Sequence, residues 1–216
     1  MAIGGIFLHT ILIPLVRLEM LGQTKQAKII NPQIISGMLN YLQTTRHPIR
    51  NQLIFLLSVR GGLRALEIAN LTWFMVMDAE GNLTDEITLP NSASKGTTGG
   101  RIIPIAKKLK ELLIAHYEIT NYKGIHQRVI QTERNMKPTA RVIVNMFLRW
   151  YKALGLEGCS SHSGRRTFIT NGAKKITSVG GSLRDIQFLS GHSSLQTTQR
   201  YIEGDSEARR KIVDLI

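Results

Sequence analysis

The feature that most constrains the fold is a set of runs with helical periodicity interrupted by one short strand-like interval. Apolar residues recur at three- and four-residue spacing over residues 34–42, after an Asn31-Pro32 pair that is typical of a helix start. A second apolar helix is expected over residues 48–60. Gly61-Gly62 favours its termination, because glycine adopts the backbone conformation of a C-terminal cap. A third, short helix is expected to begin near Arg64.

The interval that follows has the character of a small sheet. Residues 74–77, 86–89 and 101–105 are short strand-like runs, and residues 91–100 form a loop rich in Ser, Thr and Gly. Helical patterning then resumes over about residues 106–117, 139–154, 163–174, 183–189, 194–202 and, as a last polar helix, 206–216. The predicted fold class is therefore mainly α with a small three-stranded antiparallel sheet (α+β).

The charge of the chain points to an anionic partner. Its 216 residues contain 28 Lys and Arg against 15 Asp and Glu, a formal net charge of +13. Such an excess favours nucleic acid or another anionic surface. The basic residues include two runs without acidic residues that we expect to contact DNA phosphates, namely Arg46 to Arg64 and Lys95 to Lys110. Phosphate contacts position a protein without specifying sequence.

Several classes of site are excluded by residues that the sequence lacks. The single cysteine, Cys159, excludes an intramolecular disulfide and a CxxC zinc site, and it suits a reducing cytoplasm. We see neither paired carboxylates nor His/Cys ligands at metal-binding spacing, and no GxxxxGK[ST] loop for a nucleotide. We therefore expect no metal and no cofactor.

The N-terminal stretch leaves alternatives open. Residues 2–16 are apolar but interrupted by Gly4, Gly5, His9 and Pro14, and are too short to span a bilayer. They lack the basic region and cleavage site of a signal peptide. An apolar element that covers the domain, or a misassigned start with Met20 as the initiator, is favoured over export, and the sequence does not choose between the two. We expect residues 1–30 to be an extension and residues 31–216 one domain.

Four ordered sets of residues carry the chemistry. Arg64 follows Gly62-Leu63, Lys95 precedes the strand-like run at residue 101, and His162 and Arg165 form an HxxR box. Gly191-His192 is followed nine residues after the histidine by Tyr201. In this order the sequence resembles the catalytic domain of the tyrosine recombinases, the phage integrase family, over roughly residues 32–202.

The resemblance implies a role for each of these residues. Arg64 and Arg165 would clamp the phosphate, for which planar guanidinium groups are suited because they bind oxygens bidentately. Tyr201 would be the nucleophile, His162 would accept its proton, Lys95 would protonate the leaving 5′-oxygen, and His192 would donate a hydrogen bond to the phosphate. Further DNA contacts are expected from four arginines, namely Arg60, Arg101, Arg166 and Arg200. Glu67 is expected to pair with Arg64 or another cation and to orient it.

Taken singly, most of these residues have an ordinary structural explanation. Tyr201 is one of five tyrosines, and an aromatic residue on an amphipathic helix is usually part of the core. His162 alone could be a helix-start residue and Arg165 a solvated one. Arg166 departs from the histidine commoner in the family at that position. The ordered set, rather than any one member, favours the functional interpretation.

The implied function is site-specific recombination through a 3′-phosphotyrosine intermediate, without metal or ATP. The implied partner is double-stranded DNA, bound by a homotetramer on two synapsed sites, with accessory DNA-bending proteins as further partners and no membrane. The implied location is the bacterial cytoplasm at the nucleoid. Because only about thirty residues precede the first matching helix, a compact form without the N-terminal core-binding domain is expected. Two alternatives stay open: a truncated or regulatory DNA-binding relative without recombinase activity, and an enzyme like the type IB topoisomerases.

Overall fold

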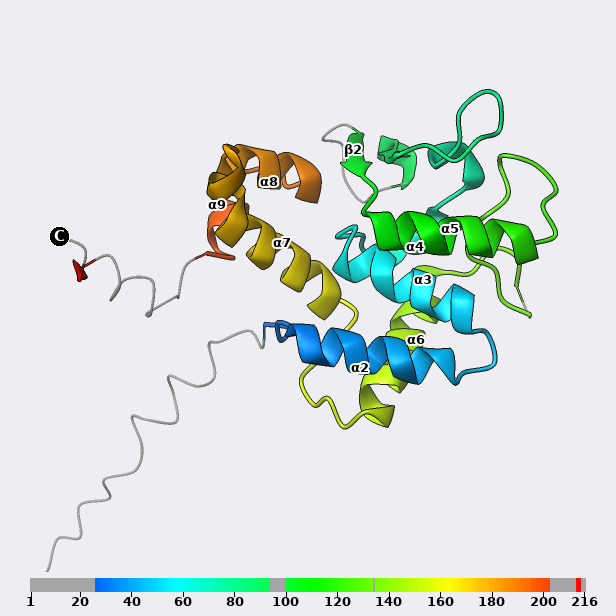
Figure 1. The fold of residues 1–216 in the computed structure, drawn as a ribbon, viewed down its shortest axis with the longest axis horizontal. Coiled ribbons are helices and arrows are strands. Elements are labelled where there is room, and N and C mark those ends of the chain that lie inside the picture. Colours follow the sequence, from blue (N-terminus) through cyan, green and yellow to red (C-terminus); the bar gives the residue numbers. More distant parts are fainter. Residues whose placement is uncertain (1–25, 94–99, 134, 203–212, 215–216) are drawn as a thin grey trace, which may run out of the picture.

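The chain folds as a mainly helical structure with one small sheet. A computed structural model describes residues 26–93, 100–133, 135–202 and 213–214 (Figure 1). The helices are α2 (Pro32–Gln43), α3 (Pro48–Val59), α4 (Ala65–Asn70), α5 (Lys107–Ile119), α6 (Ala140–Ala153), α7 (Ser163–Lys175), α8 (Leu183–Ser190) and α9 (Leu195–Gln199). The strands are β1 (Glu86–Leu89) and β2 (Arg101–Pro104), and the 3-10 turns are η2 (Trp73–Met75), η3 (Asn91–Ala93) and η4 (Ile176–Val179).

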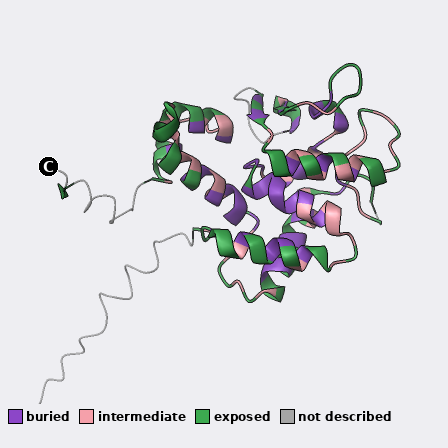
Figure 2. Cartoon of the chain, in the orientation of Figure 1, coloured by how far each residue is buried: buried purple, intermediate pink, exposed green. Residues whose placement is uncertain are grey.

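Helix α3 forms the centre of the core. Every residue of α3 from Leu53 to Val59 is buried, so the helix is covered on all sides rather than on one face (Figure 2). Helices α2, α5 and α7 pack around it. Helix α2 begins where the Asn31-Pro32 pair predicts, and the Asn31 side chain accepts a hydrogen bond of 2.8 Å from the Ile34 N–H.

The sheet differs from the prediction, because the expected strand at residues 74–77 is absent. Strands β1 and β2 pair antiparallel, with Glu86 opposite Pro104 and Leu89 opposite Arg101. The segment before them forms the 3-10 turn η2, and only an isolated bridge joins Met77 to Leu83. Within the described part of the chain the sheet therefore has two strands.

The reason is the burial of Trp73. Its ring is fully buried and packs edge-on against Tyr117, with centroids 5.1 Å apart. The N–H groups of Trp73 and Phe74 donate to the carbonyls of Gln127 and Ile125. This backbone pairing with a distant loop replaces the strand ladder that the apolar pattern of residues 74–77 suggested.

The predicted helices up to residue 202 fall within about three residues of the observed ones. Helix α9 ends at Gln199 instead of continuing to residue 202. The polar helix expected over residues 206–216 lies outside the described residues, apart from 213–214. No helix in the described ranges has the length and apolar character that a membrane crossing requires.

Helices α7, α8 and α9 lie together on one side of the molecule (Figure 1). Helix α7 joins them to the core by a close approach to α3. At Gly164 an added Cβ would lie 2.5 Å from the Ser58 hydroxyl oxygen, so only glycine fits there without a shift. This approach brings the start of α7 next to the loop that connects α3 to α4, and the functional site is built at that junction.

Candidate active site

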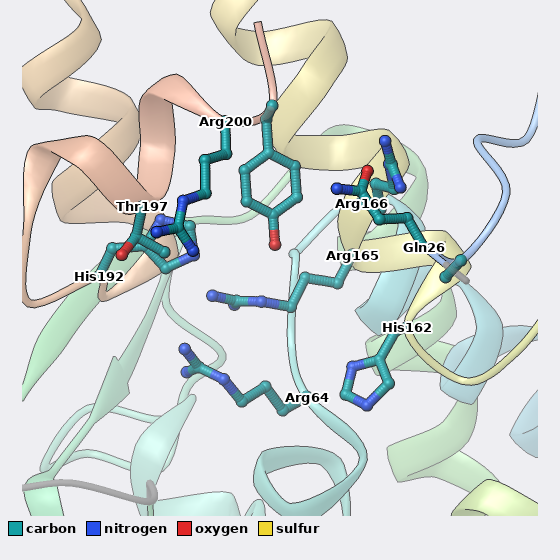
Figure 3. Close-up of a pocket in the computed structure, with 10 residues that line it drawn as sticks. Gln26, Arg64, His162, Arg165, Arg166, His192, Thr197 and Arg200 are labelled. Carbon is teal, nitrogen blue, oxygen red and sulfur yellow. The ribbon is translucent and has the colours of Figure 1, made fainter. Parts of the chain in front are cut away.

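A cleft of about 430 Å³ opens between the α3–α4 loop, the start of α7 and the segment from α8 to Tyr201 (Figure 3). The guanidinium ends of Arg64, Arg165 and Arg200 reach toward the same part of the cleft as His192, while His162 lies on the opposite side. The lining residues are Gln26, Ala27, Arg64, His162, Arg165, Arg166, His192, Thr197, Arg200 and Tyr201. None of these is acidic, so the cleft is suited to an anion.

The structure brings most of the predicted site residues into this one cleft. Seven of them line it, namely Arg64, His162, Arg165, Arg166, His192, Arg200 and Tyr201. Lys95 lies outside the described residues. Arg60 is exposed at the C-terminal cap of α3 and Arg101 is buried in β2, and neither lines the cleft.

Arg165 forms the floor of the cleft. Its side chain comes from the first turns of α7 and the residue is only 4% exposed. It donates to the Gly62 carbonyl at 2.6 Å and to the Ser190 carbonyl, which join it to the α3–α4 loop and to the end of α8. Burial, and next the charge of Arg64, lower the pKa of Arg165 to about 9. The group stays charged at neutral pH, and an anion in the cleft would offset the cost of its burial.

Glu67 holds two arginines. The carboxylate is fully buried and accepts hydrogen bonds from both of them. Two come from the N–H and Nη1 of Arg64, at 2.7 and 2.9 Å, and two from Nη1 and Nη2 of Arg101, both at 2.8 Å. Burial alone would raise the pKa of Glu67, but the hydrogen bonds and charge of Arg101, together with those of Arg64, lower it to about 2. Glu67 therefore orients Arg64, as the sequence predicts.

The expectation that Arg101 contacts DNA does not fit the structure. The residue is 6% exposed, and its guanidinium faces inward. Besides its two bonds to Glu67, its Nε donates to the Leu189 carbonyl at 3.0 Å. With these donors engaged inside the protein, the side chain is not placed to meet a phosphate on the surface.

His192 is placed by the turn that ends α8. Gly191 has φ +61°, and an added Cβ would meet Arg101 Nη1 at 2.8 Å, so another residue here would strain the backbone and displace the Arg101 side chain. The His192 Nδ1 lies 2.9 Å from the Thr198 hydroxyl. Burial, and next the charges of Arg165, Arg64 and Arg101, lower the pKa of His192 to about 4. The imidazole is therefore neutral at pH 7, and when Thr198 donates to Nδ1 its proton is on Nε2.

Tyr201 lies two residues after the end of α9, following the C-cap residue Arg200. Its N–H donates to the Thr198 carbonyl at 3.0 Å, and its ring stacks on His192 with centroids 5.5 Å apart. Thr198 thus contacts both residues, through its hydroxyl and its carbonyl. Sequence reasoning missed this buried threonine, as it missed Thr197 and Gln26 in the cleft lining, because no motif distinguishes such residues from ordinary polar ones.

In the described part of the chain no three His, Cys, Asp or Glu side chains come together as they would around an ion.

Comparison with known proteins finds relatives that match most of the chain. The family model described as "Phage integrase family" matches residues 28–207. Tyrosine recombinase XerC of Rickettsia canadensis is 30% identical over 155 residues, which are 71% of this chain and 47% of the relative. Tyrosine recombinase XerA of Thermococcus kodakarensis is 28% identical over 189 residues, 85% of this chain and 61% of the relative. The chain spans about half the length of the first of these relatives.

Solved structures share the fold. The crystal structure of XerA recombinase matches with a TM-score of 0.66 and 21% identity, over 88% of this chain and 65% of the other. The Tn1549 transposon integrase in complex with a circular intermediate DNA matches with a TM-score of 0.68 and 18% identity, over 90% of this chain and 67% of the other. At these identities the likeness establishes the fold.

Proposed function

Because the chain belongs to the phage integrase family, we propose that it is a site-specific DNA recombinase that cleaves and rejoins strands through a 3′-phosphotyrosine intermediate. The observation that carries the proposal is the convergence of Arg64, Arg165, His192 and Tyr201 on one cleft without acidic lining. The match covers 47% of the length of the first relative, so the activity is proposed from the residues of this chain.

Cleavage is a transesterification in which the phosphorus stays bonded to the 3′-oxygen and exchanges its 5′-oxygen for the tyrosine oxygen. The Tyr201 oxygen attacks the phosphorus, the bond from phosphorus to the 5′-oxygen breaks, and a 3′-phosphotyrosine bond forms. The phenol proton passes to His162, which lines the same cleft. The leaving 5′-oxygen takes a proton from Lys95, a residue outside the described ranges. A 5′-hydroxyl from a second duplex reverses these steps and restores a phosphodiester without ATP.

The charge of the site favours the transition state. Arg64 and Arg101 donate hydrogen bonds to the carboxylate of Glu67, and Arg165 interacts electrostatically with Glu67 and with both of these arginines. The three arginines and the one carboxylate together carry a net charge of +2. This positive charge supports binding of a phosphate whose negative charge increases in the transition state. Loss of one preorganised donor of this kind costs about 3–4 kcal/mol in comparable sites. The neutral His192 adds a hydrogen-bond donor without adding charge.

We assign double-stranded DNA as the substrate, with four copies of the chain on two synapsed sites and accessory DNA-bending proteins as further partners. The family likeness supports this assembly, and DNA is named in the structure of the Tn1549 relative. Residues 31–216 act as one catalytic domain and residues 1–30 as an extension. The reaction takes place in the bacterial cytoplasm, at the nucleoid.

The test is capture of the covalent intermediate. The chain is expressed beside its native genome, cells are lysed in denaturing detergent without crosslinker, and protein-bound DNA is sequenced. We expect enrichment at discrete loci for the wild type and for Tyr41→Phe, a matched substitution on α2 outside the cleft, and none for Tyr201→Phe.

Each other outcome identifies an alternative. Adducts that persist in Tyr201→Phe would exclude this residue as the nucleophile. Salt-dependent DNA binding with no adduct in the wild type would favour a binding-only relative. Relaxation of a supercoiled plasmid that lacks the recovered loci would favour a topoisomerase.

A further inference from the structure

Arg101 connects two parts of the cleft that lie far apart in the chain. It stands at the start of β2, and its planar guanidinium binds both oxygens of Glu67, each at 2.8 Å. Its Nε donates to the Leu189 carbonyl at 3.0 Å. One buried side chain therefore contacts the partner of Arg64 on one side and the end of α8 on the other.

The contact with α8 fixes the place from which His192 projects. The carbonyls of Leu189 and Ser190, at the C-terminal end of α8, accept from Arg101 and Arg165 respectively. The last carbonyls of a helix have no partner within it and lie at the negative end of its dipole, so two cations are well placed there. His192 follows two residues later, across a glycine whose Cα approaches the Arg101 guanidinium too closely for a Cβ.

We propose that Arg101 is a positioning residue for the cleavage reaction, which sets the placement of Arg64 relative to His192 through Glu67 and the end of α8. The inference rests on the proposed recombinase function and gives Arg101 a role other than contact with DNA. Arg101 does not line the cleft; it lines a neighbouring hollow together with Gly191 and His192.

Stability alone is a poor reason for this arrangement. A buried ion pair often contributes little net stability, because taking its charges out of water offsets their attraction. Its geometric specificity is high, since the guanidinium is a rigid fork that orients each partner. A lysine at residue 101 keeps the charge but cannot present three donors in one plane, so it releases either Glu67 or Leu189.

The first measurement follows His192 directly and needs no DNA. Histidine ring nitrogens are observed by NMR in the wild type, in Arg101→Lys and Arg101→Gln, and in Arg141→Lys, an exposed arginine of α6 outside the cleft. The His192 signals, assigned with a His192→Gln variant, should move in both Arg101 variants and stay in place in Arg141→Lys. The pKa of His192 should rise in Arg101→Gln, which removes a neighbouring positive charge.

The second measurement separates chemistry from binding in cells. Covalent adducts are captured without crosslinker, and total occupancy at the same loci is measured after formaldehyde crosslinking. Arg101→Lys should lower the adduct about 10- to 100-fold, the scale of a small misplacement of reacting groups, while occupancy stays within about twofold. Arg141→Lys should change neither quantity, and the circular dichroism of each variant checks its fold.

The outcomes distinguish the inference from the function on which it rests. Adduct and occupancy that fall in parallel would overturn the inference, because Arg101 would then serve binding or folding. An unchanged adduct level would overturn it too. Absence of adduct in the wild type would instead contradict the proposed function. In that case the NMR signals of His192 are the only test of the positioning role of Arg101. Signals that are unchanged in Arg101→Lys would overturn that role.

Discussion

The imidazole of His192 and the phenol of Tyr201 lie stacked, with ring centroids 5.5 Å apart and planes 22° from parallel. Thr198 holds both, because its hydroxyl contacts the His192 ring and its carbonyl accepts the Tyr201 N–H. The spacing of nine residues between the two aromatic residues therefore corresponds to a direct contact. A neutral imidazole is thus placed against the proposed nucleophile.

Replacing Tyr201 with Phe should abolish covalent attachment and leave DNA affinity within about twofold. Phenylalanine keeps the ring that stacks on His192 and removes only the attacking oxygen. A gel of denatured protein and labelled DNA measures attachment, and a filter-binding titration measures affinity. Loss of affinity by more than tenfold would show that the phenol contributes to binding as well as to attack.

The stability of the chain should decrease as pH falls from about 6.5 toward 4, because the folded state holds His192 neutral while the unfolded state protonates it. The pKa of His192 is lowered to about 4, and burial lowers that of His116 in the same direction. Urea titrations at pH 7 and pH 5 measure the difference. The decrease should be smaller in His192→Gln, and an equal decrease would contradict the assignment.

Glu67→Gln should destabilise the fold by about 3–5 kcal/mol, the usual cost of removing one partner of a buried ion pair. Arg101 would be left with a neutral amide that cannot accept both of its bonds. In the wild type, the pKa of Glu67 of about 2 adds stability above pH 4.5 that is lost as pH falls toward 2. Chemical denaturation measures the change, and Glu111→Gln, at an exposed residue of α5, is the control.

Gly62→Ala should destabilise the chain more than Gly155→Ala. Both glycines have positive φ, +66° and +63°, so each substitution meets backbone strain of about 1–2 kcal/mol. Only at Gly62 would the new Cβ also meet a side chain, the Phe168 ring at 2.5 Å, at a further cost of about 1–3 kcal/mol. Thermal melts of the two variants isolate the packing contribution, and equal melting temperatures would show that the Phe168 ring moves freely.

Arg200→Gln should weaken the salt dependence of DNA binding. The side chain is exposed and lines the cleft, where it is placed to contact a phosphate. Loss of one phosphate contact reduces the slope of log affinity against log salt by about 0.9. Titrations between low and moderate salt measure the slope. An unchanged slope would show that Arg200 makes no phosphate contact. Arg141→Gln removes one positive charge outside the cleft and controls for the change in the net charge of the protein.

Most of the secondary structure could be predicted because it depends on local patterns. The start of α2 at the Asn31 cap and the end of α3 before Gly61-Gly62 each depend on residues next to them in the sequence. The strand predicted at residues 74–77 was wrong, because the backbone at Trp73 pairs with a loop more than fifty residues away. Local apolar patterning has no information about such a partner.

The sequence by itself determined the family pattern, the excess of positive charge and the order of the site residues, because each depends on residue type and spacing. Tertiary structure decided which of those residues share the cleft. Arg101 and Arg200 look alike in the sequence, yet the fold buries the first against Glu67 and leaves the second exposed. The physical reason is that burial and pairing depend on elements brought together from distant parts of the chain, here β2, α4 and the end of α8.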